Sequence, residues 1–76
     1  MSYTNYIMEN IFKERLKELR EERELNQSQL ALESGISQAA IAKWESGDRT
    51  PNMYSLIILS KYFGVTTDYM LGLTDD

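Results

Sequence analysis

The sequence predicts an all-α protein of five helices with a helix-turn-helix at its centre, and three observations carry this prediction. Apolar residues recur every three or four positions in residues 11–23, which is the spacing of one face of a helix. Cap residues and stop glycines alternate twice between residues 25 and 47, which is typical of two short helices around a tight turn. The same signals return over residues 52–72 and predict two further helices.

The first predicted helix covers residues 11–23. Its buried stripe consists of Phe12, Leu16 and Leu19, while Lys13, Lys17 and Glu21 lie outside. Residues 1–10 are apolar only intermittently, and we expect them to form an N-terminal arm that is either disordered or packed on a partner. The domain itself is expected to span residues 11–73, and residues 74–76 to form an acidic tail.

The central pair of helices is marked by residues that cap helix ends. The side chain of Asn26 can cap free backbone N–H groups, and Gln29 completes a capping box three residues later. Gly35 stands where the end of a helix requires a positive φ, and Ser37 offers the cap of the next helix. A helix-turn-helix is therefore expected at about residues 27–46.

The second helix of this pair has two different faces, at about 100° per residue. One face is apolar apart from a glutamate and consists of Ala40, Ile41, Trp44 and Glu45. The other is small and polar and consists of Gln38, Ala39, Ala42, Lys43 and Ser46. An amide and a cation can hydrogen-bond to base edges and phosphates in a DNA major groove. A polar outer face is also the default of any amphipathic helix, so the pattern alone leaves both interpretations open.

Two more helices follow the central pair. The fourth helix is expected to begin after Asn52 or Thr50, which are both cap residues, and to end at Gly64. Thr66 then caps a short helix over residues 67–71.

Composition excludes several classes of protein. The chain contains no Cys and no His, so we expect no disulfide, no ordinary zinc site and no cofactor. An enzyme is not expected, because there is also no Gly-rich phosphate loop. No segment approaches the ~18 apolar residues of a membrane helix, and the N-terminus does not resemble a signal peptide. We therefore expect one small, soluble, cytoplasmic domain.

The net charge of −4 argues against nucleic-acid binding, which usually depends on clustered Lys and Arg. Acidic and basic residues cancel within residues 13–24 and again within residues 27–63. The acidic excess comes from Glu9, Asp68, Asp75 and Asp76. The predicted DNA-contacting face is thus neutral overall, and we expect each subunit to bind DNA weakly, so that dimerisation is needed.

The spacing of the motif residues resembles a known family. The matching residues are Leu25-Asn26-Gln27, Leu30-Ala31, Gly35, Ser37-Gln38, Ile41, Trp44-Glu45-Ser46-Gly47, Thr50-Pro51, and Leu56 through Gly64-Val65. They resemble the lambda-repressor and Cro type of helix-turn-helix domain over residues 11–73. The resemblance implies a compact five-helix, lambda-repressor-like DNA-binding domain, whose second motif helix enters the major groove.

The resemblance also implies which side chains meet DNA. The expected contact residues are Gln27, Ser37, Gln38, Ala39, Ala42, Lys43 and Arg49. Gln27 would meet a phosphate and brace Gln38, whose amide can pair with adenine. The methyl group of Ala39 could meet thymine, Lys43 could reach a phosphate or guanine, and Arg49 would contact the flanking backbone.

Two further sets of residues stand out, one on the family pattern and one by its helical spacing. Arg20 and Glu45 hold positions at which a basic and an acidic residue pair beneath the motif, and we interpret this pair as structural. On the fourth helix the inward positions are Leu56, Leu59, Ser60 and Phe63. A second row there, continued at the C-terminal end, consists of Tyr54, Ile58, Tyr62, Tyr69 and Leu73. The second row either covers the N-terminal arm, is simply half exposed, or forms a dimer interface.

The leading hypothesis is a dimeric, sequence-specific transcriptional regulator of phage or bacterial type, and more specifically a repressor. Its partner would be double-stranded DNA with a pseudo-palindromic site, because a two-fold symmetric dimer presents two identical reading helices. The alternative is the antitoxin of a toxin–antitoxin pair, which would bind its own promoter and a protein toxin.

Overall fold

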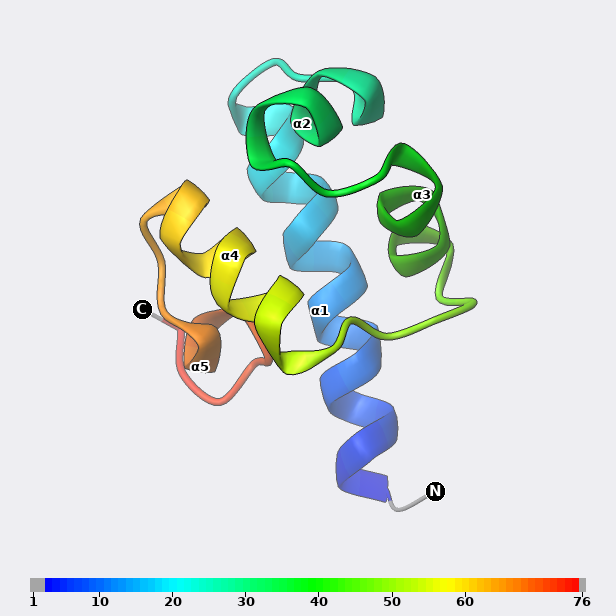
Figure 1. The fold of residues 1–76 in the computed structure, drawn as a ribbon. Helices are drawn as coiled ribbons and strands as arrows, with labels where there is room; N and C mark the ends of the chain where they lie inside the picture. The colour runs from blue at the N-terminus through cyan, green and yellow to red at the C-terminus, as the bar shows by residue number, and fades with distance from the viewer. Residues whose placement is uncertain (1–2, 76) are drawn as a thin grey trace.

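The computed structural model describes residues 3–75, and Figure 1 shows that this part of the chain is built from helices. The helices are α1 (Tyr3–Glu22), α2 (Gln27–Ser34), α3 (Gln38–Ser46), α4 (Met53–Phe63) and α5 (Thr67–Met70). The all-α class and the five helices expected from the sequence are confirmed. In the described part of the chain, no helix is both long and apolar enough to cross a membrane. Residues 1–2 of the expected arm and Asp76 of the expected tail lie outside the described residues.

α1 is longer than expected, because it begins at Tyr3 rather than near residue 11. Residues 3–10 are helical, so the expectation of a disordered arm is wrong for them. This stretch contains neither Gly nor Pro, and nothing in it stops a helix. The side-chain amide of Asn10 also donates a hydrogen bond to the carbonyl of Tyr6, one turn earlier, at 2.8 Å. Figure 1 shows these first turns projecting beyond the rest of the molecule.

The other helix boundaries follow from side-chain caps and left-handed glycines. Each of α2 to α5 begins after a side-chain oxygen that accepts a hydrogen bond from a backbone N–H of the first turn; these caps are Asn26, Ser37, Asn52 and Thr66. The capping box of Asn26 and Gln29 has both of its hydrogen bonds, at 2.7 and 2.8 Å. Gly35 ends α2 with a φ of 78°, as predicted. The caps expected from the sequence are confirmed, with Asn52 rather than Thr50 at α4.

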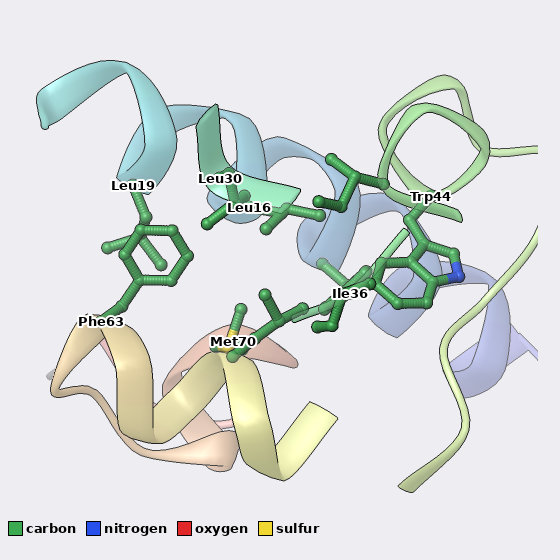
Figure 2. Packing of buried hydrophobic residues seen from close by; sticks show 10 residues of the cluster. Leu16, Leu19, Leu30, Ile36, Trp44, Phe63 and Met70 are labelled. Atoms are coloured by element: carbon green, nitrogen blue, oxygen red, sulfur yellow. The ribbon is translucent and has the colours of Figure 1, made fainter. Parts of the chain in front are cut away.

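One apolar core joins all five helices. Its buried members are Phe12, Leu16, Leu19, Leu30, Ile36, Ile41, Trp44, Leu59, Phe63 and Met70. Figure 2 shows Leu19 of α1 facing Phe63 of α4 across this core. Phe12 meets Trp44 edge to face, with ring centroids 6.5 Å apart. α1 contacts α3 and α5, and α2 contacts both α3 and α4, so the helix-turn-helix is held on a frame made by α1 and α4.

The segment after α5 is fastened to α1 by Arg15. The guanidinium lies over the ring of Tyr69, 4.2 Å from its centroid. It donates hydrogen bonds to the backbone carbonyls of Tyr69 and Thr74, and it lies 3.4 Å from the carboxylate of Asp75. A planar, forked guanidinium can make these contacts together, whereas a lysine ammonium cannot. The chain up to Thr74 is therefore part of the folded domain.

Alanine substitutions at Gly72 and Gly35 test whether the segment after α5 packs on α1. Both have a φ of 78°, so alanine is strained at either position by about 1 kcal/mol. A Cβ at Gly35 would meet nothing within 4 Å, but one at Gly72 would lie 2.5 Å from Cδ1 and 2.8 Å from Cγ2 of Ile11. We expect Gly35→Ala to lower the free energy of unfolding by about 1 kcal/mol and Gly72→Ala by about 2–4 kcal/mol, since overpacking adds to strain. Equal losses in urea denaturation would show that the C-terminal segment does not pack on α1.

Candidate nucleic-acid interface

α3 carries the two predicted faces on opposite sides. Ile41 and Trp44 are buried in the core, and Ala40 is half-buried beside them. The outer face is exposed, apart from one half-buried alanine, and consists of Gln38, Ala39, Ala42, Lys43 and Ser46. The predicted division of faces is confirmed. Gln38 is the first residue of α3, directly after Ser37, whose hydroxyl accepts a hydrogen bond from the N–H of Ala40 at 3.1 Å.

A nearly buried ion pair lies behind this face. Nε and Nη2 of Arg20 each donate to one carboxylate oxygen of Glu45 at 2.8 Å, and the two side chains are 11% and 5% exposed. Nη1 of Arg20 donates to the carbonyl of Leu25, before α2, at 2.8 Å. The hydrogen bonds to Glu45 raise the pKa of Arg20 above its ordinary value, so the guanidinium stays charged. A bidentate, charge-assisted contact thus connects α1 with α3.

The side chain of Gln27 has a different partner from the one implied by the resemblance. Its Nε2 donates to Oε1 of Glu45 at 3.2 Å. Among the described residues, the amide is therefore joined to the ion pair and not to Gln38. Gln27 and Glu45 are 18 positions apart, and no local spacing signals that they meet.

The loop after α3 folds back on the last turn of that helix. The backbone N–H groups of Asp48 and Arg49 donate to the carbonyl of Lys43 at 2.9 and 3.3 Å, and the side chain of Arg49 is exposed. Lys13 of α1 lies beside the same loop, with its Cδ 3.4 Å from the place that a Cβ at Gly47 would take. The sequence placed Lys13 only on the outside of its helix. Its position at the C-terminal end of α3 depends on how α1 packs against α3.

Charges of both signs surround this edge of the molecule. Two shallow polar hollows between α1 and the loop share Glu9 and Gly47 in their linings, and the first also includes Lys13 and the second Asp48 and Arg49. In the described part of the chain, the cations near the end of α3 are thus offset by nearby acids. DNA binding at this surface would depend on contacts of a few individual side chains more than on a broad positive potential.

A comparison with protein families agrees with this geometry. A helix-turn-helix family model matches residues 16–70. The chain belongs to the helix-turn-helix family. The match begins within α1 and ends with α5, and so leaves the projecting first turns of α1 outside it.

Several curated relatives of this helix-turn-helix chain carry the names of transcriptional regulators. The transcriptional activator BcrR of Enterococcus faecalis is 50% identical over 61 residues, which are 80% of this chain and 30% of the relative. The uncharacterised regulator YobD of Bacillus subtilis is 38% identical over 63 residues, which are 83% and 56% of the two chains. Repressor protein C2 of Salmonella phage P22 is 34% identical over 58 residues, which are 76% and 27%. The chain thus spans 27% to 56% of the length of these relatives. No solved structure gives a significant match.

α4 of this helix-turn-helix domain leaves apolar side chains uncovered. Tyr54 and Ile58, both expected at a dimer interface, are 68% and 43% exposed. Met53 and Ile57, which the predicted row did not include, are exposed beside them on the same helix. We call these four residues the α4 face. Leu73, also expected at the interface, is 60% exposed.

The two other residues expected at the interface are engaged within the chain, and both are half-buried. Tyr69 lies under Arg15. The hydroxyl of Tyr62 donates a hydrogen bond to Glu33 of α2, which raises the pKa of Tyr62 above its ordinary value. Arg23 also covers the Tyr62 ring, 4.9 Å from its centroid. The last turn of α4 is thus occupied by contacts with α2 and with Arg23, which directly follows α1, and Tyr62 is not a free apolar surface.

Removing the acid of the ion pair tests whether the pair holds α3 in place. Glu45→Ala leaves Arg20 charged and nearly buried without its partner, so we expect a loss of about 3–5 kcal/mol in the free energy of unfolding. The single tryptophan, Trp44, allows urea denaturation to be followed by fluorescence. The control is Glu22→Ala, an exposed change that should cost about 0.5 kcal/mol or less. A loss below about 1 kcal/mol for Glu45→Ala would mean that the pair behaves like an exposed one.

Proposed function

We propose that the chain is the sequence-specific DNA-binding domain of a transcriptional regulator, and that α3 enters the major groove of double-stranded DNA. The observation that carries the proposal is the outer face of α3, which is small and polar while the opposite face is anchored in the core. Such a face can approach base edges closely. The names of the three relatives support a role in regulating transcription.

The residues of the proposed interface have different roles. Gln38 reads adenine through a bidentate amide contact, and the methyl of Ala39 meets thymine. Lys43 reaches a phosphate in preference to a guanine, and Arg49 contacts the flanking backbone. The proposed contact residues are Ser37, Gln38, Ala39, Ala42, Lys43 and Arg49, together with the backbone N–H of Gln27 at the start of α2.

Base-reading and phosphate-contacting side chains are expected to respond differently to removal. Gln38→Ala should lose about 1–3 kcal/mol on a duplex selected from a random library and relax base choice at one position of each half-site. Lys43→Ala and Arg49→Ala should weaken binding to all sequences about equally and reduce the salt slope by about 1 for each phosphate that is no longer neutralised. Fluorescence anisotropy at several salt concentrations measures both effects. An unchanged sequence preference in Gln38→Ala would remove Gln38 from the reading surface.

We further propose that the DNA-binding unit is a homodimer joined through the α4 face and Leu73. Four exposed apolar residues on one side of one helix are more than scattered surface positions, and Tyr and Met are favoured at interfaces. The mixed charges near α3 give one domain little attraction to DNA. A dimer would compensate for this, because two linked domains on one duplex bind more tightly than either alone. A two-fold dimer would select a pseudo-palindrome with half-sites about one helical turn apart.

Charges placed on the α4 face should separate the subunits. We expect Tyr54→Glu with Ile58→Glu to sediment as a monomer at concentrations at which the wild-type protein is a dimer, because the interface would bury two carboxylates without partners. Leu32→Glu is the control for a single added surface charge, since Leu32 is 86% exposed on α2 and is not one of the residues of the proposed interface. A wild-type protein that is monomeric throughout, or a dimer that survives the double change, would rule this interface out.

The relatives do not favour the antitoxin hypothesis, because none of those described above is named an antitoxin. They include one protein named an activator and one named a repressor. The proposal is therefore for regulation through DNA binding, without a fixed direction of control.

A further inference from the structure

We infer that Gln27 is a positioning residue for DNA reading, whose side chain acts through Glu45 and not by touching DNA. The inference rests on the proposed DNA-binding function. Its basis is a polar junction at which α1, α2 and α3 meet, made of Glu45, Arg20, Gln27 and the carbonyl of Leu25. We call this group the Glu45 junction.

The carboxylate of Glu45 is shared among donors from two other helices. Oε2 accepts from Nε of Arg20, and Oε1 accepts both from Nη2 of Arg20 and from Nε2 of Gln27. Because the side chain of Glu45 is almost fully buried, these donors take the place that water would have at an exposed carboxylate. The amide of Gln27 therefore forms part of the solvation of a buried charge.

The backbone of Gln27 is fixed independently of this contact. Gln27 is the first residue of α2 and directly follows Asn26, whose capping box with Gln29 has both of its hydrogen bonds. The side chain is half-buried. A shift of α3 relative to α2 must therefore stretch the Gln27 contact with Glu45 or break the cap.

This contact adds a second constraint to the motif. Arg20 joins α1 to α3 and also holds the carbonyl of Leu25, which precedes the cap of α2. Gln27 adds a contact from a residue of α2 itself to Glu45 of α3. The hydrogen bond from Gln27 thus connects α2 with α3, in addition to the contact of α1 with α3. It fixes the start of α2 relative to the outer face of α3, and DNA would have to meet both at once. An error in this spacing would weaken contacts to bases more than general attraction to phosphates.

A double-mutant cycle tests whether Gln27 acts through Glu45. On the duplex that the wild-type protein selects from a random library, Gln27→Ala should bind about tenfold more weakly, with affinity for random duplex changed by about twofold or less. The same change is then made in a background with Arg20→Met and Glu45→Leu. Replacing both members of a buried pair with apolar side chains is often neutral for folding. In that background Gln27→Ala should have no further effect on affinity.

The outcomes separate this inference from the proposed function. If Gln27→Ala loses the same factor in both backgrounds, its side chain contacts DNA directly and the inference fails. If Gln27→Ala leaves affinity for the selected duplex unchanged, the inference also fails. If the wild-type protein selects no duplex at all, the proposed function fails instead, and the contact can still be measured without DNA.

The free protein supplies that second measurement. Gln27→Glu would place another carboxylate beside Glu45, and like charges raise the pKa of one of them in the folded state. A raised pKa makes the protonated form part of the native state, so the stability of this variant should fall as pH rises through that pKa and recover in acid. Ser28→Glu, on the exposed side of the same turn, adds the same charge away from Glu45 and should lack this effect. Identical pH profiles of melting temperature for the two variants would overturn the inference.

Discussion

The carboxylate of Glu45 lies where three helices meet, and the orientation of α3 depends on how its charge is satisfied there. A buried charge without partners is strongly unfavourable, and here Arg20 and Gln27 supply three donors. An apolar pair of similar volume could provide comparable stability, because the desolvation of both charges offsets much of their attraction. The polar contact contributes chiefly to the relative orientation of the helices. Hydrogen bonds from Arg20 and Gln27 allow few relative orientations of α1, α2 and α3, whereas apolar packing tolerates more.

Local chemistry determines where each helix begins, but it does not make these helices stable alone. α2 has eight residues and α5 has four, and helices this short are marginal in water. Caps satisfy the free N–H groups at their starts, and the core supplies the remaining stability. Capping and core packing together also determine which residues of α3 are exposed. Ser37 caps the helix in the turn, which places Gln38 in the exposed first turn while Ile41 and Trp44 hold the helix in the core.

The charges near α3 and the apolar α4 face both bear on the proposed binding of DNA by a dimer. A surface on which Lys13 and Arg49 are offset by Glu9 and Asp48 gives little general attraction to phosphates. Specific contacts would then carry a larger share of binding, and pairing of two domains would supply the affinity that one lacks. The exposed side chains of α4 provide a surface suited to that pairing, on a different helix from the proposed reading face.

Features that depend on neighbours along the chain could be derived from the amino-acid sequence alone. Caps at Asn26 and Ser37, the left-handed Gly35 and the two faces of α3 follow from side chains within a few positions, so they could be predicted. The true start of α1 was missed because helices lack a required start signal, and an intermittent apolar pattern resembles an arm. The buried pairing of Arg20 and Glu45 could be expected only through the family pattern, since nothing local connects them.

Contacts between distant segments depend on the tertiary structure. It joined Gln27 to Glu45 in place of Gln38, and it brought Lys13 of α1 to the end of α3. It also enclosed Tyr62 and Tyr69 in contacts with Arg23 and Arg15 while leaving the α4 face open. Periodicity shows which side of a helix is apolar, but the element that covers that side depends on how the helices pack against one another.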